Sequence, residues 1–307
     1  MHDVRSKQFQ SGRRPAQLGS ATDRAKTSWV WLTGRRLLRT PQGKIGVGIL
    51  GFFLLIALFA PLISRDNPLI QFKGHELQGP STAHIFGTDE YGRDILSRIL
   101  YGSQISFMVG LISVVIGSVV GVSTGLIAGY VRGWVEALIM RIWDAVLAFP
   151  GILTGVATVT ILGPGTLSTA LAVGIITMPG FARLALASTI AERNKEYVFA
   201  AESVGVPTRQ IITRHILPNA IGPLLVHAAL SFAAAVFFEA ALSFLGLGSQ
   251  PPTPSWGSML AESRQYLLTN PTFALFPGIA ISILLVGLNS LADGLRDALD
   301  PSTIGRL

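Results

Sequence analysis

Five intervals of the chain lack Asp, Glu, Lys and Arg and are dominated by apolar residues. They cover residues 45–64, 99–131, 145–182, 215–238 and 265–292. A helix of about 20 apolar residues crosses a bilayer core about 30 Å thick, so each interval is long enough for a span. The third interval is long enough for two, and Gly163-Pro164-Gly165 predicts a turn between them. The pattern therefore predicts an all-α polytopic membrane protein with six transmembrane helices, near 45–64, 105–130, 144–162, 167–189, 217–241 and 272–292.

The composition agrees with a membrane protein and excludes several other classes. Half of the 307 residues are apolar and 13% are charged, which is about half the charged share of a soluble domain. Such a chain is not a disordered protein, a coiled coil or a collagen-like fibre. It has no cysteine, which excludes disulfides, thiolate metal sites and a cysteine nucleophile.

The positions of the basic residues indicate the orientation in the membrane. The chain has 24 Lys and Arg against 17 Asp and Glu. With a cytoplasmic N-terminus, 19 of the 24 basic residues fall in the inside segments 1–44, 131–143, 183–218 and 293–307. This bias follows the positive-inside rule and predicts that both termini are cytoplasmic. It also explains the net charge of +7 without nucleic acid, since the basic stretches carry no signature of a nucleic-acid-binding fold.

The polar segments divide the chain into four parts. Residues 1–28 have no periodicity and are predicted to be a disordered cytoplasmic tail. Residues 29–104 would comprise a short interfacial helix over 29–42, the first span and an extracytoplasmic segment. Residues 105–294 would form the core domain, with five spans and a cytoplasmic loop at 191–218, and residues 295–307 a cytoplasmic tail. The basic leader and the first span are both too long for a signal peptide.

One extracytoplasmic stretch, residues 87–98, is rich in charged side chains. Thr88 is a suitable N-cap, and Asp89 and Glu90 suit the first turn of a helix. Apolar residues then recur at helical spacing over 95–100. We therefore predict a capped helix on the outer surface before the second span. The alternative is that the acidic residues form a catalytic or metal site.

The cytoplasmic loop between the fourth and fifth spans predicts two short helices. Residues 196–204 contain good helix formers, Gly205 suits the position after a helix end, and Pro207 stops the helix. Thr208 is then predicted to cap a second short helix that ends at Pro218.

Two interpretations of this helix pair remain open. The pair could form a compact knob for a partner, because the small Ala200 and Ala201 let another surface approach closely. Equally, it could be a helical hairpin that packs only on its own bundle.

The same loop resembles the cytoplasmic loop of binding-protein-dependent ABC importer permeases. That family's pattern is Glu-Ala-Ala, three residues, Gly, nine residues, then Ile-x-Leu-Pro. The residues in register with it are Ala200, Ala201, Gly205, Leu217 and Pro218. Two positions depart from the pattern, since Phe199 stands where the family has Glu and His215 where it has Ile.

Further stretches resemble the peptide-importer branch of that family. They are its Gly-Thr-Asp-x-x-Gly-Arg-Asp signature at 87–94, its third-helix entry at 144–150, its fifth-helix exit at 242–257 and its C-terminus at 293–301. The resemblance extends over residues 30–303 and is to the C-type permease subunit of dipeptide and oligopeptide importers. It implies the type I ABC importer permease fold, with 105–294 as the core permease domain, in a bacterial plasma membrane.

The resemblance also implies an assembly. The partners would be a second homologous permease, two ATP-binding subunits and an extracytoplasmic peptide-binding protein. ATP and Mg²⁺ would be used by the ATPase subunits, and the loop would supply the coupling helix that enters a cleft on one of them. The candidate coupling residues are Ala200, Ala201, Glu202, Gly205, Val206, Arg214, His215, Leu217 and Pro218.

The chain itself is predicted to be a transporter subunit and not an enzyme. It has no Gly-x-x-x-x-Gly-Lys-Ser/Thr motif, so no ATP site or other cofactor site is expected. No two of its five histidines stand at the spacing of a zinc motif, and no metal site is predicted. The competing class is a secondary transporter with intramembrane carboxylates. Asp144, Glu239 and Asp293 are the few such groups, and each lies near a span end.

Three residues are candidates for the translocation path. Glu239, near the outer end of the fifth span, could meet the amino end of a peptide or form an interfacial or inter-subunit hydrogen bond. Thr160 and Thr177 could line the path or join helices to each other. These residues do not distinguish dipeptides from longer peptides, nickel chelates or other solutes, because cargo selection would belong mostly to the binding protein.

Overall fold

The computed structural model describes residues 31–300, whose regular structure is helical apart from one isolated bridge between Thr88 and Asp94. A short helix over 31–37 precedes the main elements. These are α2 (Pro41–Ile63), α3 (Ile95–Val131), α4 (Gly133–Leu147), α5 (Gly151–Leu162), α6 (Thr166–Arg193), α7 (Glu196–Ser203), α8 (Thr208–Ile211), the π-helical turn η1 (Ile212–Ile216), α9 (Leu217–Phe244), α10 (Trp256–Ser263), the 3-10 turn η2 (Arg264–Tyr266) and α11 (Thr272–Leu299). The predicted all-α fold is confirmed.

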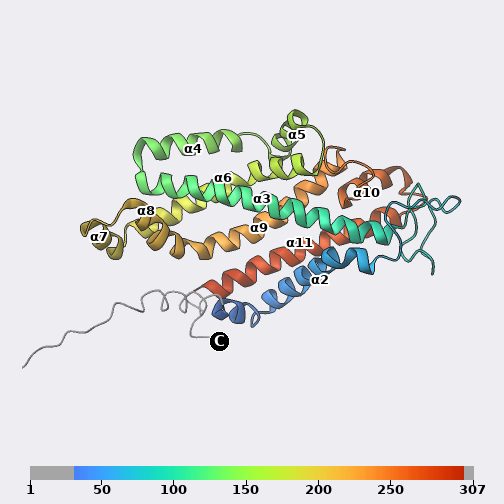
Figure 1. Ribbon diagram of the computed structural model, residues 1–307, viewed down its shortest axis with the longest axis horizontal. Helices are drawn as coiled ribbons and strands as arrows, with labels where there is room; N and C mark the ends of the chain where they lie inside the picture. The colour runs from blue at the N-terminus through green and yellow to red at the C-terminus, as the bar shows by residue number, and fades with distance from the viewer. Residues whose placement is uncertain (1–30, 301–307) are drawn as a thin grey trace, which may run out of the picture.

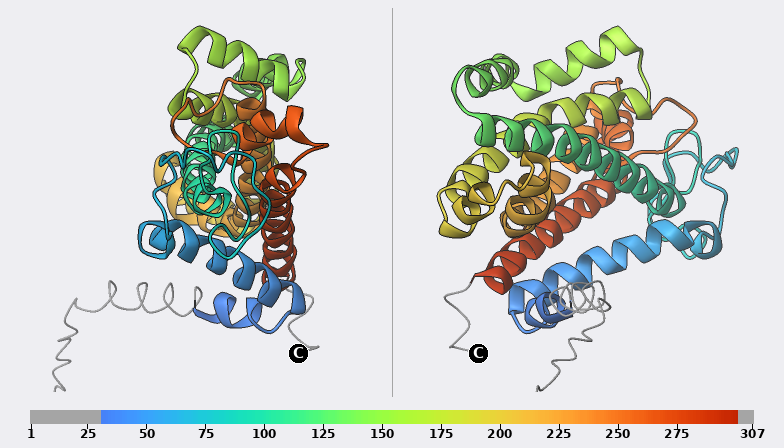
Figure 2. Two further views of the ribbon diagram at one scale, coloured as in Figure 1. Left: turned by 90° about the vertical axis from the view of Figure 1, so that its right-hand side faces the viewer. Right: turned by 60° about the vertical axis from the view of Figure 1, so that its left-hand side comes forward.

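The long helices run between two ends of the molecule (Figure 1). One end, called here the hairpin end, carries α7 and α8, and the other, called the α10 end, carries α10 and the loop over 64–94. α2 and α11 lie side by side, with α4 and α5 on the opposite side of the bundle (Figure 2). The start of α2 and the end of α11 both lie at the hairpin end, as an even number of spans predicts.

The number of possible spans agrees with the prediction of six. Five helical stretches are each long and apolar enough to cross a membrane, namely α2, α3, α6, residues 208–244 and α11. The pair α4 and α5 makes a sixth span if its two parts are counted together. The protein is therefore a multi-pass membrane protein built from α-helices.

The third span is not the single helix predicted over 144–162. α4 begins well before residue 144, and the chain turns by 90° between α4 and α5. Pro150 explains the break, because it has no N–H to donate and it disfavours the helical conformation of Phe149. Asp144, expected at the start of the span, lies inside α4, and its carboxylate pairs with the guanidinium of Arg183 on α6 at 2.7 Å.

α3 packs along α6 through a row of glycines at every fourth position. The row is Gly117, Gly121, Gly125 and Gly129. A Cβ atom at Gly125 would lie 2.3 Å from the carbonyl oxygen of Ala182, so only glycine permits this approach. Small residues at spacing of four are the usual way in which membrane helices come close. The row places the end of α3 directly beside the end of α6, where the α7–α8 hairpin begins.

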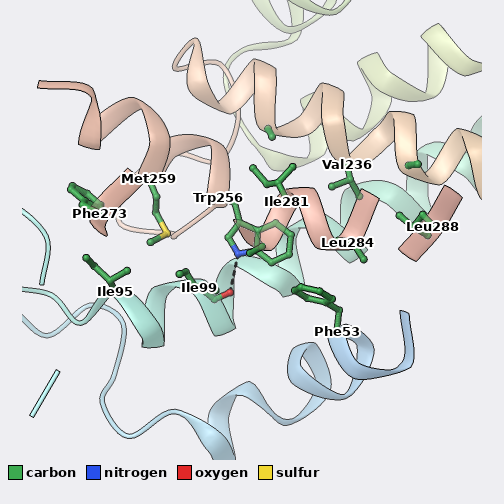
Figure 3. Close-up of a cluster of buried hydrophobic side chains, with 13 residues drawn as sticks. Phe53, Ile95, Ile99, Val236, Trp256, Met259, Phe273, Ile281, Leu284 and Leu288 are labelled. Atoms are coloured by element: carbon green, nitrogen blue, oxygen red, sulfur yellow. Dashed lines mark hydrogen bonds between the residues drawn. The ribbon is translucent and has the colours of Figure 1, made fainter. Parts of the chain in front are cut away.

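A cluster of buried side chains holds α10 against the long helices (Figure 3). Trp256, the first residue of α10, is fully buried, and its indole nitrogen donates to the carbonyl oxygen of Ile99 at 3.0 Å. Phe53 of α2, Val236 of α9 and Leu284 of α11 pack around it. Since the partners of Trp256 come from the four helices α2, α3, α9 and α11, α10 is part of the bundle and not a separate surface element.

Two predicted boundaries change at the ends of the chain. α11 continues to Leu299, so residues 295–299 of the predicted tail belong to this helix. The last span is longer because Ala298 is buried against the bundle, which favours continuing the helix beyond Asp293. The predicted interfacial helix over 29–42 is seen over 31–37, followed by a turn before α2. The tail predicted over 1–28 and the end of the one over 295–307 lie outside the described residues.

Candidate functional site

The loop at 196–218 begins with α7, which ends in a turn at Gly205. Gly205 has φ +77°, a conformation that side chains disfavour, as expected for a glycine that follows a helix end. Its N–H donates to the carbonyl oxygen of Glu202 at 3.0 Å, and the N–H of Val206 donates to Ala201 at 3.1 Å. The predicted end of the first short helix is therefore confirmed.

The second half of the loop differs from the prediction. Pro207, and not Thr208, occupies the cap position, and the helix does not end at Pro218. Instead, α8 passes through the π-helical turn η1 into α9, and the N–H of Leu217 donates to Ile212 across that turn. Pro218 directly follows this wider π-helical turn, and the helix continues through it although the proline has no N–H to donate. Residues 208–216 are thus a continuous extension of α9, and the turn at Gly205 joins them to α7.

One face of the hairpin packs on the bundle and the other is open. Val198, Ile211 and Ile216 are buried next to side chains of α3 and α6. Phe199 is 54% exposed and Val204 is 79% exposed. The two interpretations of the loop are therefore compatible, because its inner face belongs to the bundle and its outer face presents apolar side chains.

The predicted coupling residues are divided between these faces. Those on the open face are Ala200, Gly205, Arg214 and Pro218, which are exposed, while Ala201 is buried. Those with intermediate exposure are Glu202, Val206, His215 and Leu217. Their role in coupling stays a prediction.

Two tyrosines that the sequence analysis did not select hold the hairpin in place. The hydroxyl of Tyr130, in the last turn of α3, donates to Glu202 at 2.9 Å. The hydroxyl of Tyr197 donates to Glu192 and lies 3.1 Å from the amide nitrogen of Asn219. Partial burial, and then the hydrogen bond to Glu192, raise the pKa of Tyr197 to about 12. Tyr130 lies one residue before the end of the apolar interval 99–131, but only the pairing of α3 with α6 brings it to the hairpin.

We expect Tyr130→Phe to loosen α7 without unfolding the bundle. The change removes a hydrogen bond to a carboxylate, which contributes about 1.5–3 kcal/mol. If this bond limits local opening, amide hydrogen exchange in α7 should become about 10–100-fold faster. Hydrogen-exchange mass spectrometry measures this change. Tyr266→Phe, at the α10 end, is the control and should leave exchange in α7 unaltered; unchanged exchange in both variants would contradict the anchoring role of Tyr130.

A hollow of about 680 Å³ lies beside the hairpin, between α6, α9 and α11. Its lining includes Pro218, Asn219, His227 and Arg296, together with apolar side chains such as Leu230. Its volume is in the range of sites that take small molecules. The end of the hairpin therefore borders a space that could admit a small solute.

The three path candidates occupy different environments. Glu239 is 1% exposed, and its carboxylate accepts a hydrogen bond from Ser243 at 2.8 Å. Thr177 is 8% exposed and donates to the carbonyl oxygen of Gly174 at 2.9 Å. Thr160 is exposed on α5. In this conformation Glu239 and Thr177 face their own bundle, and a place in the path stays a prediction for all three.

The charged stretch at 87–98 does not form the predicted capped helix. α3 begins only at Ile95, and Asp94 is its N-cap, accepting the N–H of Ser97 at 2.8 Å. The hydroxyl of Thr88 instead accepts the N–H of Gln78 at 2.9 Å. The positive φ angles of Gly87 and Gly92 keep the chain before α3 in tight turns, which excludes a helix there.

The acidic residues of this stretch form a buried ionic cluster. Asp89 accepts from Arg93 at 2.6 Å and also pairs with Arg98. Arg98 is 2% exposed and pairs with Glu262 of α10 at 2.8 Å. Burial raises the pKa of Glu90, with Glu262 and Asp89 acting in the same direction. This ionic cluster, consisting of Asp89, Glu90, Arg93, Arg98 and Glu262, joins the loop over 64–94 to α10.

Two family models match the sequence. One, described as "Binding-protein-dependent transport system inner membrane component", matches residues 121–305. The other, "N-terminal TM domain of oligopeptide transport permease C", matches residues 28–80.

Several curated proteins are similar over most of their length. The chain is 44% identical to the dipeptide transport system permease protein DppC of Alkalihalophilus pseudofirmus, covering 87% of this chain and 88% of that protein. It is 43% identical to the di/tripeptide transport system permease protein DppC of Pseudomonas aeruginosa, covering 85% and 89%. It is 41% identical to the glutathione transport system permease protein GsiD of Escherichia coli, covering 92% and 93%.

A solved structure shares the fold. The chain superposes on a chain of the MetNI methionine ABC transporter in an inward-facing conformation, with a TM-score of 0.57. The match covers 67% of this chain and 98% of that chain at 17% sequence identity. At this identity the comparison shows the ABC importer permease fold alone.

Proposed function

The chain belongs to the family of inner membrane components of binding-protein-dependent transport systems and is a permease subunit of an ABC importer, and we propose that its cargo is di- and tripeptides. The cargo is supported by relatives above 40% identity that are named for dipeptides, di/tripeptides and glutathione. All of these are short peptides with a free carboxylate, which defines the substrate class.

The proposed assembly contains four kinds of subunit. A second homologous permease completes the path, two ATP-binding subunits use ATP and Mg²⁺, and an extracytoplasmic protein delivers the peptide. The chain has no phosphate-binding motif of its own, which supports assigning ATP to the partners. The excess of Lys and Arg in the hairpin-end segments supports a cytoplasmic hairpin end and cytoplasmic termini in the plasma membrane.

The observation that carries the mechanism is the unbroken helix from residue 208 to 244. An ATPase that moves the open face of the hairpin would move α8 through the tight turn at Gly205, and α9 with it, because no break separates α8 from α9. Tyr130 would pass the same movement to α3 through its hydrogen bond to Glu202. Coupling then consists of two ATPase states that favour two positions of one rigid unit. The hollow beside Pro218 would be the inner end of the peptide path.

The test is reconstitution of the complex in lipid vesicles. Uptake of a labelled dipeptide is expected only with ATP, both ATPase subunits and the binding protein. Uptake that continues without the ATPase subunits would support a secondary carrier and contradict the proposal. An unlabelled tripeptide should reduce uptake of the labelled dipeptide. If a nickel chelate reduced uptake as strongly as the tripeptide, the proposal that the cargo is di- and tripeptides would be wrong.

A further inference from the structure

Three potential metal ligands converge at the α10 end, outside both the hairpin and the hollow. They are a ring nitrogen of His84 and carboxylate oxygens of Asp66 and Asp94, all within 4.8 Å of one another. They come from separate parts of the chain, because Asp66 follows α2, His84 lies in the loop and Asp94 caps α3. We propose that these three side chains form a zinc site.

The separation of the two buried ligands fits zinc. His84 Nδ1 and Asp94 Oδ1 share a hydrogen bond of 3.1 Å in this structure, and a zinc ion between them would take the place of the shared proton. Two ligands of a tetrahedral Zn²⁺, each about 2.0–2.1 Å from the metal, stand about 3.3 Å apart. Asp66 is only partly buried, so its side chain can close the remaining separation by rotation. Three protein ligands and one water would complete a tetrahedron.

The surroundings orient both buried ligands. Oδ2 of Asp94 accepts the N–H and the hydroxyl of Ser97, each at 2.8 Å, which turns Oδ1 towards His84. The ring of His84 packs 5.3 Å from the ring of Phe72, which limits its rotation. Ligands held in this way by neighbouring groups are a regular feature of metal sites. His84 is 5% exposed and Asp94 is 4% exposed.

The balance of charge separates this site from the neighbouring ionic cluster. In that cluster, Asp89, Glu90 and Glu262 face the guanidinium groups of Arg93 and Arg98, which occupy the place of a cation. Between residues 31 and 300, neither Asp66 nor Asp94 is paired with Lys or Arg. Within that range, Asp66, His84 and Asp94 therefore have no guanidinium or ammonium group between them, whereas the ionic cluster contains two guanidinium groups.

The donor set favours zinc over calcium or magnesium. Ca²⁺ takes six to eight oxygen ligands and Mg²⁺ an octahedral shell of oxygens, whereas Zn²⁺ takes imidazole with carboxylate at low coordination number. A bound zinc would fasten the end of α2 to the start of α3 through the loop. The sequence does not indicate this site, because its ligands do not have the spacing of a zinc motif.

Zinc binding by the purified, chelator-stripped complex tests the proposal. Titration of Zn²⁺ against a chromophoric competitor should show one tight zinc per chain, lost in His84→Ala and weakened at least about tenfold in Asp66→Asn. Glu76→Gln, an exposed carboxylate of the same loop, is the control and should bind zinc as the unaltered chain does. Equal zinc binding in all variants, or no saturable binding, would overturn the site.

The unfolding temperature, measured with and without zinc, separates a loss of zinc binding from a loss of folding. Asp66 makes no side-chain hydrogen bond within the described part of the chain, so Asp66→Asn should unfold at the same temperature as the unaltered complex without zinc. Zinc should then raise the unfolding temperature of the unaltered complex but not that of Asp66→Asn. A zinc-induced rise of equal size in both would contradict the role of Asp66.

Discussion

Gly205→Asp is expected to abolish peptide uptake while the chain still inserts into the membrane. Gly205 is exposed at φ +77°, and a Cβ there would meet no atom within 4 Å, so the bundle has room for the side chain. The change strains the turn after α7 and places a negative charge on the open face of the hairpin. If that face seats in an ATPase subunit, a buried unpaired charge should prevent docking. ATP-dependent uptake and the amount of membrane-inserted chain are the two measurements.

The matched control is Gly246→Asp at the opposite end of the molecule. Gly246 follows α9 with φ +79° and has the same open surroundings. The N–H groups of Gly246 and Leu247 donate to carbonyl oxygens of the last turn of α9. The N–H groups of Gly205 and Val206 do the same at the end of α7. The two variants therefore impose the same backbone strain at opposite ends. Loss of uptake in both, or normal uptake by Gly205→Asp, would contradict a specific role for the hairpin.

Arg98→Met is expected to destabilise the folded chain by about 3–5 kcal/mol at pH 7, because it leaves buried carboxylates without their partner. Arg98 bridges Asp89 and Glu262, and Arg93 alone would then face three acidic groups. Unfolding in detergent, followed by heat or denaturant, measures the loss.

The pH dependence of this variant follows from the same charges. The pKa of Glu90 is already raised by burial, so its ionised form opposes folding at neutral pH. A carboxyl group whose pKa is raised by folding stabilises the folded state at a pH below its ordinary pKa. This stabilisation is lost as the pH rises through the pKa of the folded state. Protonation of the cluster should therefore make the Arg98→Met defect smaller at pH 5 than at pH 7. A defect that does not change with pH would contradict this account.

The control for Arg98 is a solvent-exposed ion pair of the same chain. Lys195 is paired with Glu192 at 2.6 Å, but its side chain is 54% exposed. Exposed pairs contribute about 0–1 kcal/mol because water screens the charges and the long side chains lose entropy. Lys195→Met should therefore change the unfolding free energy by less than about 1 kcal/mol. A loss as large as that of Arg98→Met would show that burial does not set the difference.

The two ends of the molecule are tied down by different chemistry. At the hairpin end, Tyr130 and Tyr197 use single hydrogen bonds to carboxylates at the edge of the bundle. At the α10 end, Arg98 and Trp256 are buried and join α3 to α10. Local opening needs less free energy where contacts are few and exposed. We therefore expect the hairpin to be the end that responds to a partner and the α10 end to be the more rigid.

The membrane helices and the first turn of the loop could be predicted from the sequence because their signals are local. Runs without charge locate the spans, since each residue in the bilayer core contributes its own transfer free energy. Gly205 marks a helix end through its own backbone preference, and Gly163-Pro164-Gly165 a turn, and both are present in the structure.

Pro150 and Pro218 show where local signals are insufficient. Pro150 was expected to lie inside the third span, but it breaks that span. Pro218 was expected to end a short helix, but it lies within a continuous one. Whether a proline ends a helix depends on whether the neighbouring backbone can adjust to its ring and its missing N–H. For Pro218 the π-helical turn η1 decides this, and it is seen only in the folded chain.

The sequence by itself indicated the spans, the shared end of the start of α2 and the end of α11, and the family, because these depend on hydropathy and on contiguous motifs. Only the tertiary structure decided which polar side chains meet. Asp66, His84 and Asp94 converge, and Arg98 reaches Glu262, because α2, α3 and α10 end at the same face of the bundle. Helix packing sets such long-range contacts, and no spacing along the chain encodes them.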